Sequence, residues 1–249
     1  MALSWRGKRQ VTYLGFIVGL FILILVPTAY FLYPKVSCTD GRQNGSEEGV
    51  DCGGACENIC KAPPKEVLVE WVRTFSLSAG AGSAVAYITN PNRDLYAENV
   101  SYQFKLYNSS NILIAERRGK TSIFPGASFP VFSGAIGVGN EIPNRASFSL
   151  ILDPEWQSVN LPKLQVSNQI FEASPPKLSA DIRNSGVTRL KNVIVTAVLF
   201  DADDNAYAAS ETVLEELQGG GGGKVIFTWS SLPYPPVRIL IYPKPLPVK

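Results

Sequence analysis

A stretch of 23 residues without a charged side chain, residues 11–33, is the strongest constraint on this chain. An α-helix rises about 1.5 Å per residue, so a helix of this length spans the roughly 30 Å hydrocarbon core of a bilayer. Tyr13 at one end and Tyr30 and Tyr33 at the other suit the aromatic belts of a membrane interface. We therefore predict a retained transmembrane helix, which Pro27 kinks or ends.

The basic residues Arg6, Lys8 and Arg9 precede this stretch, and no acidic residue does. Positive charge on the cytoplasmic side is the usual rule, so we expect residues 1–10 to form a cytoplasmic tail and residues 34–249 to be extracytoplasmic. A cleaved signal peptide would have an apolar region of about 7 to 15 residues and a cleavage site between small residues, which this segment lacks. The sequence thus predicts a single-pass protein of the cell membrane.

The charges of the rest of the chain nearly cancel. Removing the three N-terminal cations from 23 basic residues leaves 20 against 21 acidic ones, a net charge of −1. This balance gives no indication of a surface that binds polyanions, and nucleic-acid-binding proteins normally carry a basic stripe. We expect no nucleic-acid partner, and the oligomeric state stays open.

All four cysteines lie in a short module over residues 34–61, at Cys38, Cys52, Cys56 and Cys60. Outside the cytoplasm, closely spaced cysteines form disulfides. Their separation by 13, 3 and 3 residues lacks the matched short pairs of zinc sites and the C-x-x-C of redox sites, and the chain has no histidine. We predict two disulfides, with all three connectivities open.

Residues 38–56 resemble a short module of exported prokaryotic proteins, C-x-D-G-x-x-N-G-x-E-x-G-V-D-C-G-G-x-C, over 19 of the 249 residues. Its oxygen-bearing side chains could gather a Ca²⁺ ion, which takes several carboxylate and carbonyl oxygens. These side chains are Asp40, Asn44, Glu47, Glu48 and Asp51. Alternatively, Asp, Asn and Gly simply form turns in a segment too small to have a core. No other cofactor is indicated.

The remainder of the chain contains two similar segments. Residues 98–126 align without a gap with residues 191–219, at a constant offset of 93 residues that matches Asn99 to Asn192. Upstream, after one gap, "AYITNPN" aligns with "ADIRNSG". Two copies of one fold are the simplest explanation.

Each copy has the pattern of β-strands. In the first, apolar residues alternate with polar ones, as in a strand with one buried face. The apolar set is Val100, Tyr102, Phe104 and Leu106, and the polar set is Ser101, Gln103 and Lys105. Strands spaced by roughly 8 to 12 residues with turns between them indicate β-sandwiches.

We therefore predict an all-β chain with two tandem Ig- or fibronectin-like β-sandwiches behind the helix and the cysteine module. The predicted segments are a linker at 62–66, the first sandwich at 67–154, a linker at 155–163, the second sandwich at 164–243 and a proline-rich tail at 244–249.

Two motifs resemble known families. "QFKLYN" (103–108) and "AVLFD" (197–201) are similar to the Phe-x-Leu-Tyr-Asp core of FxLYD domains, and "TNPN" (89–92) resembles a turn of late-embryogenesis-abundant type 2 sandwiches. The second copy departs from the pattern, with Ala197 in place of the aromatic residue and "NSG" in place of "NPN". Both families are Ig-like or fibronectin-like sandwiches, so the resemblance implies the fold and no fixed activity. FxLYD domains generally occur in envelope-associated proteins.

The outward positions of the central strand differ between the copies. At the 93-residue offset, Ser101, Gln103 and Lys105 correspond to Ile194, Thr196 and Val198. A strand that is apolar on both faces is covered on both. Ile194 and Val198 are therefore candidate interaction residues, and the covering element is the first sandwich, a partner or the second sandwich itself.

Residue content argues against several activities. The absence of histidine excludes histidine-dependent triads and metal sites. The stretch "QGGGGGKV" lacks the first Gly and the final Ser or Thr of a P-loop, so we predict a flexible hairpin loop at Gly219–Gly223. The acidic residues of 201–204 and 211–216 are expected to be solvated. We predict that the protein is not an enzyme.

The sequence favours a structural, adhesive or complex-assembly role in the cell envelope, with an unknown envelope protein or glycan as partner. One alternative is a subunit of an export or pilus-like membrane machine, in which Gly15 and Gly19 let helices approach closely. Another is a carboxylate-based hydrolase, or its accessory, with a site in the groove between the sandwiches.

Overall fold

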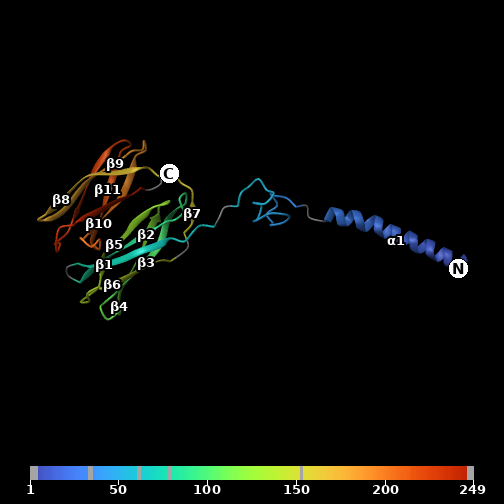
Figure 1. Cartoon of the computed structure of the whole chain (residues 1–249), viewed down its shortest axis with the longest axis horizontal. Helices are drawn as coiled ribbons and strands as arrows, with labels where there is room; N and C mark the ends of the chain where they lie inside the picture. The colour runs from blue at the N-terminus through green and yellow to red at the C-terminus, as the bar shows by residue number, and fades with distance from the viewer. Residues whose placement is uncertain (1–4, 33–35, 61–62, 78–79, 152–153, 246–249) are drawn as a thin grey trace. The chain divides into compact units, whose positions relative to one another are not determined.

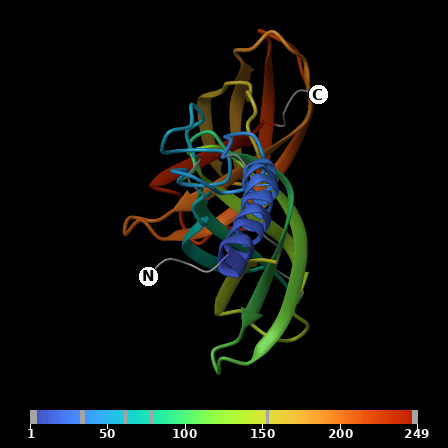
Figure 2. The ribbon, with the colours of Figure 1, turned by 90° about the vertical axis from the view of Figure 1, so that its right-hand side faces the viewer.

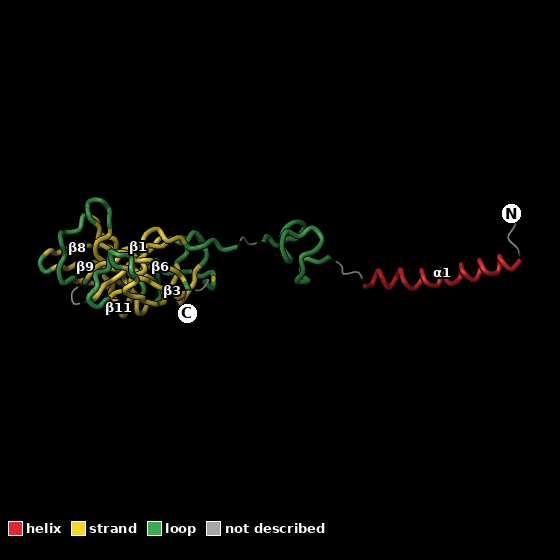
Figure 3. The backbone as a smooth tube through the Cα atoms, turned by 90° about the horizontal axis from the view of Figure 1, so that it is seen from below, coloured by secondary structure: helices red, strands yellow, loops and turns green. Residues whose placement is uncertain are grey.

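The computed structural model describes most of the chain (Figure 1). The described residues are 5–32, 36–60, 63–77, 80–151 and 154–245. They fall into two compact units, residues 1–63 and 64–249. The first unit contains the helix and the cysteine module, and the second contains all the described strands, as the colours of Figure 3 show. The predicted all-β fold with one N-terminal helix is confirmed.

Helix α1 (Trp5–Leu32) begins before the charge-free stretch and includes residues 5–10 of the predicted cytoplasmic tail. It does not end at Pro27, because the apolar residues on both sides continue the helix; the Thr28 hydroxyl donates to the carbonyl of Ile24 (2.7 Å). Twenty-six of its residues form a segment long and apolar enough to cross a membrane. A helix satisfies its own backbone groups, as a bilayer requires. Tyr33 lies outside the described residues.

The first sandwich consists of two antiparallel sheets. Its strands are β1 (Leu68–Ser76), β2 (Ala81–Thr89), β3 (Tyr96–Tyr107), β4 (Leu113–Ile123), β5 (Ser128–Gly137), β6 (Arg145–Leu150) and β7 (Trp156–Gln157). One sheet has the order β1-β2-β5 and the other β4-β3-β6, with β7 also paired to β3. Strand β7 lies in the segment that the sequence predicts to be a linker.

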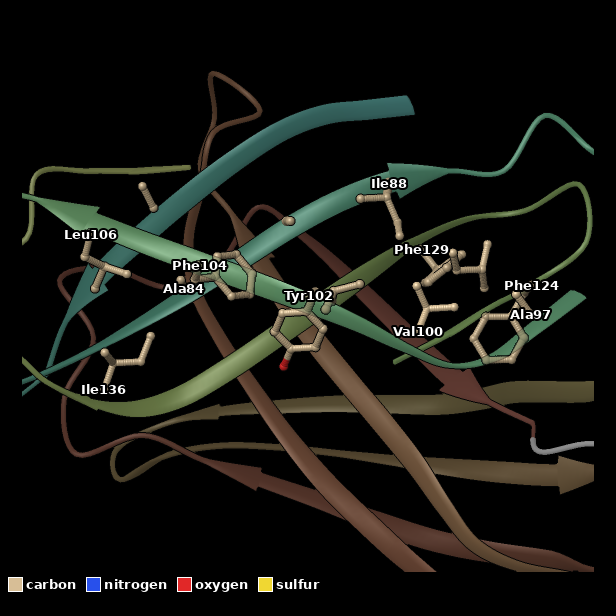
Figure 4. Packing of buried hydrophobic residues seen from close by; sticks show 14 of the residues in the cluster. Ala84, Ile88, Ala97, Val100, Tyr102, Phe104, Leu106, Phe124, Phe129 and Ile136 are labelled. Atoms are coloured by element: carbon tan, nitrogen blue, oxygen red, sulfur yellow. The ribbon is translucent and has the colours of Figure 1, made fainter. Parts of the chain in front are cut away.

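Aromatic residues fill the core of this sandwich (Figure 4). Phe104 from β3 and Phe129 from β5 are fully buried between the sheets. Phe129 packs edge-on against Phe124 (5.0 Å between ring centroids), and Phe104 does the same against Tyr102 (5.5 Å). Edge-to-face contacts of this kind add to the burial of apolar area, so the alternating residues of β3 fix which of its faces points inward.

The second sandwich repeats this arrangement. Its strands are β8 (Leu164–Ala173), β9 (Pro176–Asn184), β10 (Leu190–Phe200), β11 (Ala206–Leu217), β12 (Gly222–Thr228) and β13 (Arg238–Lys244). Its sheets are β12-β9-β8 and β11-β10-β13, so each strand occupies the place of its counterpart in the first sandwich. In Figure 2 most green strands of the first sandwich extend downward and most orange to red strands of the second extend upward, and the two sets overlap in the middle of the view.

Two asparagines recur at equivalent places in both sandwiches. Asn90 and Asn184 are fully buried, and the Oδ1 of each accepts a hydrogen bond from the backbone N–H two residues further on. Asn99 and Asn192, 93 residues apart, have positive φ angles of 57° and 51°. Asparagine tolerates this left-handed conformation better than most residues, so both strands bend at the same point.

The glycine run does not form the predicted hairpin loop. Strands β11 and β12, which flank it, belong to different sheets, and Gly222 and Gly223 already pair with β9. A Cβ atom on Gly219 would lie 2.0 Å from the carbonyl oxygen of Val187. The run is therefore a crossing between sheets in which glycine permits a close backbone approach.

Candidate functional site

The two sandwiches meet through the outer faces of two sheets, β1-β2-β5 of the first and β11-β10-β13 of the second. We call this contact the seam. Its buried residues are Val85, Val198, Phe200, Ala206 and Ala209, and the partly buried Trp71, Phe75, Phe132 and Leu240 pack around them. The seam is apolar on both sides, so the contact between the two sandwiches buries apolar side chains of both.

Val198 is one of the two candidate interaction residues, and it is fully buried in the seam against the first sandwich. Nearby, the ring of Trp71 lies edge-on to Phe200, with 6.1 Å between centroids. The second candidate, Ile194, is partly buried and lines a pocket at the margin of the seam. The surface that covers the apolar face of β10 is thus the first sandwich.

Tyr242 of β13 extends the contact into the core of the first sandwich. Its ring is stacked on Phe129 (5.7 Å) and lies 6.0 Å from Phe124. Burial raises the pKa of Tyr242 above its ordinary value. Because the ring of Tyr242 from the second sandwich packs into the core of the first, the two sandwiches share part of their hydrophobic burial.

The pocket at the margin of the seam has a volume of about 180 Å³ and contains a charged pair. The Nζ of Lys244, which is almost completely buried, lies 2.9 Å from Oε2 of Glu211, and the hydroxyl of Thr196 donates to the same oxygen (2.8 Å). Burial raises the pKa of Tyr102 in the pocket wall, and the charge of Glu211 raises it further. A buried ammonium group needs such a partner, so Glu211 holds β13 in place.

This arrangement differs from that of a carboxylate-based hydrolase, which uses two facing acidic groups. Glu211 is the one acidic side chain among the residues that line the pocket. The acidic turn of the second sandwich lies elsewhere: Asp201 accepts hydrogen bonds from backbone N–H groups of its own turn, and Asp204 pairs with Arg238 (2.6 Å). The described geometry of these residues is that of ion pairs and turn caps.

The outer face of the sheet β4-β3-β6 in the first sandwich is polar and faces solvent. Strand pairing aligns its outward side chains in four rows across the sheet. The rows are Lys120 beside Ser101; Arg118, Gln103 and Ser149; Glu116, Lys105 and Ser147; and Leu113, Tyr107 and Arg145. Each row thus contains one cation, and Glu116 is the one acidic residue in the four. We call this surface the basic face.

The cations of the basic face differ in what they contact. Lys105 lies 3.7 Å from Glu116, and the guanidinium of Arg145 lies over the ring of Tyr107 (4.3 Å). Arg118 and Lys120 take part in none of the ion pairs found among the described residues. The near-neutral charge of the whole chain therefore conceals a surface with local positive charge, which the sequence balance did not indicate.

In the cysteine module the predicted disulfides are present. Cys38 is bonded to Cys56 and Cys52 to Cys60, so one of the three open connectivities is realised. The double glycine between them is required by the fold: Gly53 and Gly54 both have positive φ, and a Cβ on Gly54 would meet the carbonyl of Ser46 at 1.6 Å. The covalent bonds replace the core that a segment of this size lacks.

The predicted calcium ligands of this module are engaged in its turns. The carboxylate of Asp51 accepts the N–H groups of Asp40 and Gly41 (2.9 Å each), and Asp40 in turn accepts from the Asn44 amide (2.7 Å). The carboxylate of Glu47 accepts two further backbone N–H groups, whereas Glu48 packs over the backbone of Gly53. Turn formation thus accounts for Asp40, Asn44, Glu47 and Asp51, and calcium binding stays a prediction.

One group in the described part of the chain has the spacing of metal ligands, namely Cys38, Glu47 and Cys56. Both of its sulfur atoms belong to the same disulfide, so neither is available as a thiolate ligand. In helix α1, Gly15 and Gly19 have open space beside them, with no atom within 4 Å of an added Cβ.

Comparisons with known proteins leave the function of the chain undetermined. No protein-family model and no curated protein sequence matches it. Among solved structures, the chain is similar to a red sea bream transglutaminase, with 12% identity and a TM-score of 0.22, over 70% of this chain and 29% of that one. The chain spans less than a third of that protein, and a similarity of this degree supports no statement about activity.

Proposed function

We propose that this protein is a single-pass, membrane-anchored binding protein with a structural, adhesive or complex-assembly role in the cell envelope. Helix α1 serves as the anchor, its N-terminal end lies in the cytoplasm, and the cysteine module and the sandwiches are extracytoplasmic. The apolar helix and the two disulfides fit a membrane-anchored protein with an extracytoplasmic part.

The observation that carries the binding role is the seam. It joins the sandwiches through their apolar outer faces and leaves a polar, solvent-exposed sheet face on the first sandwich. A pair of sandwiches joined in this way presents its remaining faces and loops in a fixed relation, which suits contact with another molecule. Kinship with FxLYD and late-embryogenesis-abundant type 2 sandwiches remains part of this proposal.

The orientation can be tested on intact cells that express the full chain. A membrane-impermeant, amine-reactive reagent is expected to label lysines of residues 63–249, while Lys8 stays unlabelled until the membrane is opened. Mass spectrometry of the peptides measures both. Labelling of Lys8 alone in intact cells would show the reverse orientation and would contradict the proposed role.

A second role, as a subunit of a larger membrane machine, is favoured by the open glycine face of helix α1. Ile22 lies on the same side of the helix as Gly15 and Gly19, and Ile17 lies on the opposite side. If helices associate through the glycines, Ile22→Cys gives disulfide-linked dimers in oxidised membranes and Ile17→Cys does not. Equal crosslinking by the two variants, or none by either, would remove this role.

A further inference from the structure

The basic face has the geometry of an extended binding surface. Its four rows follow one another at every second residue along the strands, so they cover roughly 20 Å at about 3.4 Å per residue. Because the cations Lys120, Arg118, Lys105 and Arg145 occupy successive rows, positive charge recurs along the full length of the sheet. A ligand with regularly repeated negative charges matches this spacing better than a single small anion does.

We propose that the basic face binds an acidic polysaccharide, a polymer of sugars that carry carboxylate groups. This inference rests on the proposed function, because it requires the sandwiches to lie outside the cell. Arg118 and Lys120 have no acidic partner among the described residues and are available to carboxylates. Ser101, Gln103, Ser147 and Ser149 lie between the cations and offer hydroxyl and amide groups to sugar hydroxyls.

The composition of the face favours this ligand over other anionic partners. Single-stranded nucleic acids are bound by exposed aromatic rings on which bases stack. Here the one aromatic residue in the four rows, Tyr107, is covered by Arg145. A membrane surface is usually bound by apolar side chains that enter the lipid beside the basic ones. In the four rows the one exposed apolar side chain is Leu113, which pairs with Tyr107 at the end of the face, away from Arg118 and Lys120.

The second sandwich provides an internal comparison for the charge. Its equivalent face is buried in the seam, and its free face is formed by the sheet β12-β9-β8. Two cations of that face have acidic neighbours, since Lys177 pairs with Glu172 (2.9 Å) and Lys224 lies opposite Asp181 in the strand register. Arg183 lies opposite Gly222 and Gln165 and takes part in none of the ion pairs found among the described residues. Local compensation of this kind leaves little net attraction for a polyanion.

The test uses the full chain in mild detergent and measures binding to polygalacturonate, with neutral dextran as reference. The double variant Arg118→Gln/Lys120→Gln removes two cations of the basic face. Arg183→Gln/Lys224→Gln removes two from the free face of the second sandwich and serves as the matched control. We expect the first variant to bind polygalacturonate roughly three- to tenfold more weakly and the control to bind as the natural protein does, with all binding weakened by salt.

Two further probes identify other partners. Vesicles of phosphatidylglycerol and phosphatidylcholine report on a membrane surface, and oligothymidylate reports on nucleic acid. Tighter binding to either than to polygalacturonate would overturn the inference, as would equal losses in the two double variants or no binding to the polysaccharide. If cell labelling places the sandwiches outside and polygalacturonate is not bound, the inference fails while the proposed anchoring and orientation stand.

Discussion

Strands β3 and β10 occupy the same place in their two sandwiches, but their outer faces meet different surroundings. Gln103 and Lys105 of β3 face water and form part of the basic face. Thr196 and Val198, the residues 93 positions later in β10, are completely buried, Val198 in the seam and Thr196 against Glu211 at its margin. One backbone arrangement thus supports a solvated face in one copy and an internal interface in the other.

The difference shows that the contact made by the β10 face is not available on the equivalent face of the first sandwich. The seam joins unlike faces, β11-β10-β13 of one sandwich to β1-β2-β5 of the other. A contact between unlike faces can in principle continue from copy to copy without closing. On the first sandwich, the face equivalent to that of β10 is the basic face. It has cations where β10 has apolar residues, so another apolar sheet face finds no matching surface there.

The sharpest way to break this comparison is to exchange the residues at one equivalent position. Val198→Lys places a cation in the seam between Ala209 and Leu240, its two neighbours in the strand register, and we expect the free energy of unfolding to fall by about 3–5 kcal/mol. Lys105→Val, the reverse exchange on the exposed face, is expected to change it by no more than about 0.5 kcal/mol. Denaturant unfolding followed by tryptophan fluorescence measures both, because Trp71 lies at the seam.

Side-chain size is controlled by Val198→Met, which has a similar length to lysine and no charge. Overpacking alone costs about 1–3 kcal/mol. If the lysine and methionine variants unfold at the same denaturant concentration, the seam tolerates charge and the contrast between the two faces has another cause.

The fold could be predicted because its signals are local and repeated. Alternation from Val100 to Leu106 gives a strand with one buried face, and the 93-residue offset transfers this strand to the second copy. The four cysteines predict two disulfides from compartment and spacing, but their pairing depends on the three-dimensional path of a turn built on Asp51, Gly53 and Gly54. Tertiary geometry of this kind leaves no periodic signal in a sequence.

The candidate site was less accessible to the same reasoning. The apolar outer positions Ile194 and Val198 predict that β10 is covered, but the first sandwich, a partner and a second sheet all satisfy that requirement. The basic face was missed because net charge sums over all surfaces. Its signal is present in "ERRGK" (116–120), whose alternate residues Glu116, Arg118 and Lys120 share one face of a strand once the register of β4 is known.

A smaller difference between the copies concerns the turn that follows β2 and β9. In the second copy the backbone N–H of Ser185 donates to the carbonyl of Lys163 (3.0 Å), whereas Pro91 at the equivalent place has no N–H to donate. The side chain of Asn92 takes over this role and makes two hydrogen bonds to the backbone of Lys65, both 2.8 Å. An asparagine amide thus extends the β-ladder where proline interrupts it.

We expect Asn92→Ala to lower the free energy of unfolding by about 1 kcal/mol, because three side-chain hydrogen bonds are lost, two to Lys65 and one to Oδ1 of Asn90 (2.9 Å). Amide hydrogen exchange at Lys65 should become several times faster, since its N–H then has no partner. Ser185→Ala is the matched control, because its hydrogen bond uses the backbone and survives the change. Unaltered exchange at Lys65 in Asn92→Ala would show that the segment before β1 is held by other contacts.

The smallest expected effect distinguishes the copies by pH. Tyr207 donates to the carbonyl of Tyr234 (3.0 Å), and the residue 93 positions earlier is Ile114, which cannot ionise. Burial, followed by the nearby Tyr234 and Asp201, raises the pKa of Tyr207 from 10.0 to about 12.

The pKa is higher in the folded state, so the stability that the neutral phenol contributes is complete below about pH 10 and is lost as the pH rises through about 12. Because the phenol is only partly buried and its hydrogen bond is exposed, this loss should be less than about 1 kcal/mol. Other tyrosines ionise in the same range, so the test is the difference between the natural protein and Tyr207→Phe in unfolding experiments from pH 9 to pH 12. The free energies of unfolding of the two proteins should converge as the pH rises, because the natural protein loses the contribution of the neutral Tyr207 hydroxyl, which the variant lacks. Parallel curves would mean that Tyr207 ionises equally well in the folded and unfolded chain.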